Sequence, residues 1–155
     1  MTLNEELTIV LKEELRILQK LKETTYDKTD IIVANEIEKL EEITRLEEDL
    51  INKIALKEKE REEILYNWGI GENASISEII EKIPEGKVEL SNLKMELTEL
   101  IANIQSRNLV NKELIEDNLQ WLDFNMNLIY NVQTPPTYGD KKKTTGNNSL
   151  FDRKV

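Results

Sequence analysis

The stretch Asn108–Asn131, which reads NLVNKELIEDNLQWLDFNMNLIYN, is where the interpretation of this chain begins. It contains neither Pro nor Gly, so it can form one uninterrupted helix. Its large apolar residues form two stripes, which at ~100° per residue together span roughly 220° of the helix surface. The first stripe consists of Ile115, Leu119, Leu122, Met126 and Ile129. The second stripe consists of Val110, Leu114, Trp121, Phe124 and Leu128.

Two apolar stripes are more than a helix needs to face its own core, because an ordinary surface helix uses about half of that width. The excess predicts that the helix buries one stripe in its own protein and offers the other to a partner. The alternative is a central helix that neighbours cover on both sides. Asn111, Asn118 and Asn125 run between the stripes and continue the phase of a leucine-rich heptad seam. Asn in that seam indicates that it is no longer a dry core there. The seam consists of Leu90, Leu93, Leu97, Leu100 and Ile104.

The composition favours a helical protein and argues against several functions. Glu, Lys, Leu and Ile dominate the 155 residues, as is typical of long helices and coiled coils. The net charge of −10 argues against a nucleic-acid partner and an anionic membrane surface. Without Cys or His, the chain lacks thiolates, the commonest general base and the commonest metal ligand. We therefore expect no catalytic, cofactor or metal site. We also expect a cytoplasmic location, since no signal-like or membrane-spanning apolar run is found.

The helix pattern predicts an all-α fold, an elongated antiparallel helical bundle or coiled coil of three long helices with a short connecting helix. We place the helices at about 3–34, 36–67, 76–83 and 87–131, followed by a disordered tail over 132–155. The first turn is placed near Asn35, because Asn35 and Glu38 match a capping box. The alternative is one unbroken helix from Leu3 to Trp68. Gly69 suits the end of the second helix, and Ser75 with Glu78 matches a second capping box.

The predicted helix lengths differ, and this has a consequence for the last helix. About 45 residues give ~65 Å for the last helix, whereas the first helix reaches only ~50 Å. Its last ~10 residues should therefore overhang the bundle. Beyond them, Pro135 and Pro136 end the helix, and the tail carries five basic and two acidic residues, so 5 − 2 = +3.

Several segments match a known family. They are Ile32–Ile37 at the first turn, Ser75–Ile80 before the last helix, and the residues Asn108, Leu109 and Asn111 with their Leu-rich continuation. In the tail they are Thr137-Tyr138-Gly139-Asp140 and the terminal stretch Ser149–Val155. On these segments the chain resembles the FlgN family of flagellar export chaperones, of which the tail is the more specific feature.

The resemblance implies a cytoplasmic chaperone of flagellar type III export. Family members bind the hook-filament junction proteins FlgK and FlgL, prevent their aggregation and deliver them to the export gate. The gate protein FlhA and the escort protein FliJ are further implied partners. By position, the resemblance implies that Tyr138 docks at the gate. Client binding is implied at the last helix, where the candidate residues are Leu114, Ile115, Leu119, Trp121, Leu122, Phe124, Met126, Leu128 and Ile129.

A different class of function is compatible with the same helices. A structural coiled-coil protein could use the spare stripe to associate with itself, forming a homo-oligomer at high concentration with no need for the tail motif. A homodimer of the chaperone likewise stays an alternative, because an exposed stripe can pair with a second copy. A bundle enzyme holding a metal or cofactor is disfavoured by the absence of His and Cys.

Overall fold

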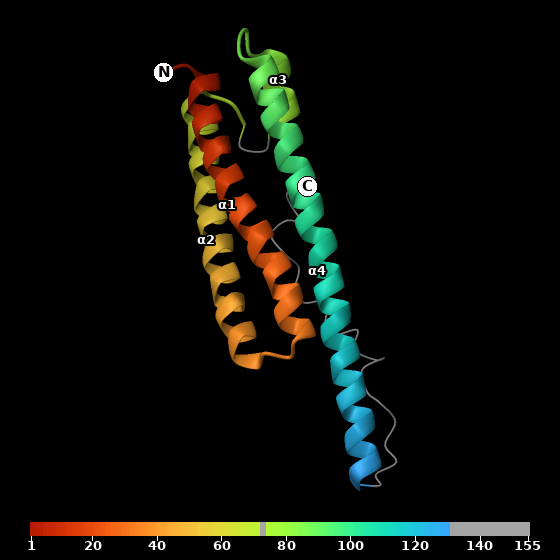
Figure 1. Ribbon diagram of the computed structural model, residues 1–155. Helices are drawn as coiled ribbons and strands as arrows, with labels where there is room; N and C mark the ends of the chain where they lie inside the picture. Colours follow the sequence, from red (N-terminus) through yellow and green to blue (C-terminus); the bar gives the residue numbers. More distant parts are fainter. Residues whose placement is uncertain (72–73, 131–155) are drawn as a thin grey trace.

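The computed structural model describes residues 1–71 and 74–130, apart from the side chains of Asn125, Ile129 and Tyr130. These residues form α1 (Leu3–Val33), α2 (Ile37–Asn67), α3 (Ile76–Lys82) and α4 (Lys87–Tyr130), as Figure 1 shows. The predicted all-α class, with three long helices and one short connecting helix, is confirmed. The predicted tail lies outside the described residues.

The α1 helix is the one on which the other two long helices both pack (Figure 1). α2 returns antiparallel beside α1, and α4 starts at the same end as α1 and runs in the same direction. α3 packs against α4 near that end. The result is an elongated up-down-up arrangement in which α1 has a helical neighbour on each side.

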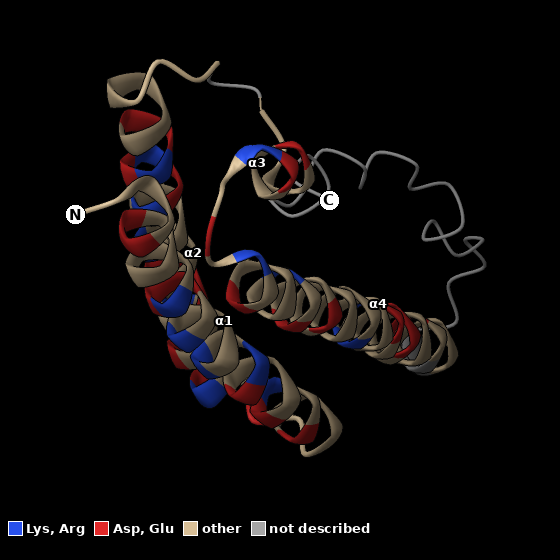
Figure 2. Cartoon of the chain, turned by 90° about the horizontal axis from the view of Figure 1, so that it is seen from above, with Lys and Arg blue, Asp and Glu red and all other residues tan. Residues whose placement is uncertain are grey.

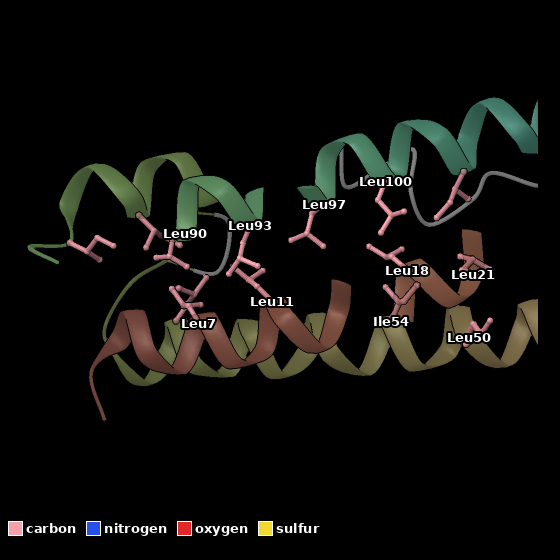
Figure 3. Packing of buried hydrophobic residues seen from close by; sticks show 14 residues of the cluster. Leu7, Leu11, Leu18, Leu21, Leu50, Ile54, Leu90, Leu93, Leu97 and Leu100 are labelled. Atoms are coloured by element: carbon pink, nitrogen blue, oxygen red, sulfur yellow. The ribbon is translucent and has the colours of Figure 1, made fainter. Parts of the chain in front are cut away.

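Leucine and isoleucine side chains from all four helices form the core, which follows the length of α1 (Figure 3). The α4 seam that was predicted from its heptad spacing is buried throughout, and Ile104 has no exposed surface. Each such side chain contributes roughly 1.5–3 kcal/mol when it leaves water. The buried residues of this cluster are Leu7, Leu11, Leu18, Leu21, Leu50, Ile54, Leu65, Ile79, Ile83, Leu90, Leu93, Leu97, Leu100 and Ile104.

The turn between α1 and α2 lies near Asn35 as predicted, but the capping box expected there is wrong. Asn35 has φ +59° and follows the end of α1 instead of starting α2. Its N–H donates to the Ile32 carbonyl, and the Glu36 N–H donates to the Ile31 carbonyl. This is the Schellman pattern, which requires a residue in the left-handed region. Asn tolerates that region better than most residues, and this explains its place in the turn.

The other helix ends follow the sequence signals. Gly69 has φ +73° and closes α2 with a second Schellman pattern, in which the Ile70 N–H donates to the Leu65 carbonyl over 2.9 Å. The Ser75 hydroxyl accepts from the Glu78 N–H, so the structure gives the Ser75 half of the predicted capping box.

Ion pairs join α1 to α2 along their polar sides, where acidic and basic residues alternate in Figure 2. The Lys57 ammonium lies 2.6 Å from the Glu13 carboxylate, and the Arg61 guanidinium lies 3.3 Å from the Glu14 carboxylate. Hydrogen bonds to Glu13 and then Glu60 raise the pKa of Lys57 above the ordinary value of a lysine. Charged residues within positions 57–63 of α2 thus help to orient α2 on α1.

Candidate functional site

The last part of α4 extends beyond the end of α1. The Thr29 hydroxyl of α1 donates to Asn111 Oδ1 of α4, which fixes the level of the two helices. α1 ends four residues later at Val33. Because the helices run in the same direction, α4 loses this neighbour about one turn after Asn111, near Ile115. Residues 117–130, called the overhang below, therefore project past the α1–α2 turn by ~21 Å (Figure 1).

The overhang exposes large apolar side chains from both stripes. Their exposed fractions lie between 40% and 66%, whereas Leu114 and Ile115 at the junction are half-buried. Several large apolar side chains exposed together on a folded protein are typical of a surface that binds another molecule. The exposed apolar residues of the overhang are Leu119, Trp121, Leu122, Phe124, Met126 and Leu128.

Two sequence-based expectations about this segment are corrected by the structure. The prediction that one stripe is buried in the protein itself is wrong for the overhang, and so is the alternative of a helix covered on both sides. The physical reason is that α1 and α2 turn near Asn35, so that neither of them lies beside residues 117–130. The predicted overhang of ~10 residues is present and somewhat longer. The Ile129 side chain and Tyr138 lie outside the described residues.

A buried polar cluster ties three helices together where α4 leaves the bundle. Asn111 is only 3% exposed, and its Nδ2 donates to the Thr25 carbonyl over 3.0 Å. On the other side of α1, the Lys28 ammonium lies 2.8 Å from the Glu47 carboxylate of α2. The interpretation that the Asn seam is not a dry core therefore needs qualification, because Asn111 is buried with satisfied hydrogen bonds. Only farther along, at Asn118, is the seam exposed.

The partners of Asn111 were missed in the sequence because the pattern pointed elsewhere. Thr25 and Thr29 lie in a β-branched, polar stretch that reads as the weakest helical part of α1. The Thr25 hydroxyl donates to the Leu21 carbonyl one turn earlier in α1, whereas the Thr29 hydroxyl donates to Asn111. The available signal was the seven-residue phase of Asn111 with the buried seam, which places it against α1.

A separate cleft lies at the opposite end of the molecule, where α1 begins and α2 ends. Its volume is about 460 Å³, and its walls are mainly apolar. The Trp68 indole N–H donates to the Glu6 carboxylate over 2.6 Å beside it. No sequence signal indicated this cleft, because its walls come from three distant segments: Thr2, Leu3, Asn4, Trp68, Ile70, Ala74, Glu78, Ile79, Lys82, Ile83, Pro84 and Glu85.

The described part of the chain offers little for metal chemistry or membrane insertion. Over residues 1–71 and 74–130, no three or more Asp or Glu side chains are grouped so that they could hold a metal ion. None of the helices in these ranges combines the length and apolar character needed to cross a membrane.

Fold and surface together define an elongated helical-bundle protein whose last helix presents an uncovered apolar end. The profile of the family described as FlgN protein matches residues 1–146, and the chain belongs to this family of flagellar export chaperones. The matched range includes Tyr138 and ends before the terminal stretch Ser149–Val155. Among curated proteins and solved structures, none matches the chain.

Proposed function

We propose that this protein is a cytoplasmic flagellar export chaperone that binds the hook-filament junction proteins FlgK and FlgL through the end of α4. It keeps these clients from aggregating and delivers them to the type III export gate. The observation that carries the proposal is the overhang, which exposes six large apolar side chains beyond the end of α1. Covering them with client removes apolar area from water at roughly 25 cal/mol per Å².

The arrangement also suits release, which an export chaperone needs. The overhang is short and its side chains are already partly in contact with their own helix, so the gain from covering them is moderate. Association and ordering costs take back several kcal/mol of that gain. We expect a dissociation constant in the micromolar to sub-micromolar range. This corresponds to a binding free energy of about −8 kcal/mol or slightly more favourable.

The tail completes the proposal. We assign Tyr138 to docking at the gate protein FlhA, with the escort protein FliJ as a further partner. The family match supports this assignment because it extends through Tyr138. The rival function, a structural protein that associates with itself, is favoured by the same exposed apolar surface and must be separated by experiment.

The deciding experiment is co-purification with the FlgK and FlgL of the same organism, followed by sizing of the complex. Three chains are compared: the full chain, residues 1–130 and residues 1–116. We expect the first two to hold the client and the third, which lacks the overhang, to lose it. No complex with any of the three, together with a homo-oligomer that grows with concentration, would replace the chaperone by the self-associating protein.

A further inference from the structure

We propose that two separate helices of the client cover the overhang, one on each stripe, so that the overhang becomes the centre of a three-helix unit. This inference rests on the proposed chaperone function and adds the form of client that the surface accepts. The client must supply two amphipathic helices, and the one over the second stripe must carry a basic residue.

The angular positions of the stripes require two helices. Their centres lie about 140° apart around the α4 axis at ~100° per residue. Packed helices have axes about 8–10 Å apart, so neighbours centred on the two stripes would have axes roughly 17 Å from each other. A helix with its side chains is only about 10–12 Å wide. One client helix therefore cannot cover both stripes, whereas two helices fit without collision.

The first stripe continues an interface that already exists in the protein. It keeps the phase of the seam that packs on α1, in which Ile104 and Asn111 are the last buried members. A client helix on the first stripe would thus lie along the line of α1, beginning where α1 ends at Val33. The arrangement has a precedent within the fold, since α1 itself packs against one long helix on each side.

The second stripe, in contrast, does not continue the seam that packs on α1. It begins at Val110, close to the point where α4 leaves α1. Earlier along α4, the residues at this angle between positions 92 and 106 are polar and exposed, and apolar side chains are exposed beside that row only singly, at Val88 and Met95. The change coincides with the overhang, which indicates a surface made for a partner. These earlier residues are Asn92, Glu96, Glu99, Asn103 and Ser106.

Charge decides which occupant is chosen. Asp117 is exposed and falls within the second stripe, at the three- and four-residue spacing between Leu114 and Trp121. Residues 112–130 contain four acidic residues and one basic residue, so 1 − 4 = −3. A second copy of this chain would bring the same negative charge onto the surface. A client helix with Lys or Arg facing Asp117 would instead gain an ion pair.

Photo-crosslinking tests the two-helix arrangement directly. A benzophenone amino acid replaces Met126 on the first stripe, Leu128 on the second or Asp123 on the polar side, each in the full chain bound to co-purified FlgK or FlgL. We expect Met126 and Leu128 to label two client peptides that lie apart in the client sequence, and Asp123 to label little. Labelling of one and the same client helix from both positions overturns the inference while leaving the chaperone function intact. Absence of any complex with the unmodified chain overturns both.

A pair of charge reversals tests the basic residue. Asp117→Lys and Asp123→Lys change the net charge equally, but only Asp117 lies within a stripe. We expect Asp117→Lys to weaken client binding about tenfold and Asp123→Lys to change it by less than about twofold, with the difference shrinking at high salt. Equal effects of the two variants would mean that the second stripe does not face a basic helix.

Discussion

At the scale of single residues, Asn111 is the polar side chain on which the α1–α4 junction depends. Asn111→Ala removes both of its hydrogen bonds to α1 and leaves a small cavity, so we expect a loss of about 1–3 kcal/mol in the free energy of unfolding. Urea denaturation followed by circular dichroism measures it. Asn103→Ala is the matched control, because Asn103 is exposed on the same helix and should change stability by less than about 0.5 kcal/mol. Equal losses would deny Asn111 this role.

Gly86, directly before α4, is a second position where a single added carbon atom should change stability. It has φ +78°, and an added Cβ would collide with the Asn4 side chain at the start of α1. Gly86→Ala should therefore cost at least about 1–2 kcal/mol of stability, since a left-handed conformation is strained for Ala even before the collision. Gly71→Ala, where an added Cβ meets nothing within 4 Å, serves as the comparison in the same thermal melts. A Gly86→Ala protein as stable as the wild type would show that the loop before α4 adjusts freely.

The turn at Asn35 shows what residue patterns cannot decide. An Asn followed three residues later by Glu matches a helix start, and the sequence alone predicted a capping box there. Asn is also one of the few residues that adopt the left-handed region, which is what the end of α1 requires. Both roles place a turn at the same point in the chain, so the location was predictable. The role depends on which helix end Asn35 belongs to, and local spacing does not contain that information.

At the scale of elements, the overhang should be separable from the fold that carries it. Leu122→Asp places a charge in the first stripe, which a client would have to bury, so we expect client affinity to fall at least tenfold. Trp121→Asp should do the same from the second stripe. Stability should change by less than about 0.5 kcal/mol, because Leu122 is already half exposed. Affinity is measured by titration of labelled client, and stability by thermal melting.

Gln120→Asp is the control for this prediction, since it introduces the same side chain at an exposed position outside both stripes. It should bind client as the wild type does. Unfolding of the whole protein by Leu122→Asp would show that the first stripe belongs to the core after all. Equal loss of binding with Gln120→Asp would point to net charge as the cause.

The sequence predicted that the end of α4 overhangs the bundle, but it did not predict that both stripes are exposed there. The difference between two predicted helix lengths was enough to expect an unpaired end of α4. Periodicity then gave the relative angles of Leu119 and Trp121, but angles alone do not say which neighbours are present. That depends on where α1 stops relative to Asn111, a level that the Thr29 hydrogen bond fixes in three dimensions.

At the scale of the whole molecule, α1 is the organising element, and this was not evident in the sequence. The long α4 helix contains the two apolar stripes, which are the most conspicuous sequence feature. However, α1 is the helix on which both other long helices pack. Ion pairs such as Lys57–Glu13 help to orient α2 on it. The charged run containing Lys57 gave no sign of this in the sequence, because charges within one helix can equally pair with each other.

The two ends of α4 should therefore contribute very differently to stability. The segment up to Asn111 packs on α1, whereas residues 117–130 lie beyond the ends of both α1 and α2 at their turn. A chain ending at residue 116 should have a free energy of unfolding in urea within about 0.5–1 kcal/mol of that of the full chain. Its m value should also be nearly the same, because m follows the surface newly exposed on unfolding. A chain ending at residue 103 loses Ile104 and Asn111, both buried, and should be several kcal/mol less stable. A clear loss of stability or of m in the chain ending at 116 would mean that the overhang packs on its own protein in solution, and a surface covered in that way would not be free for a client.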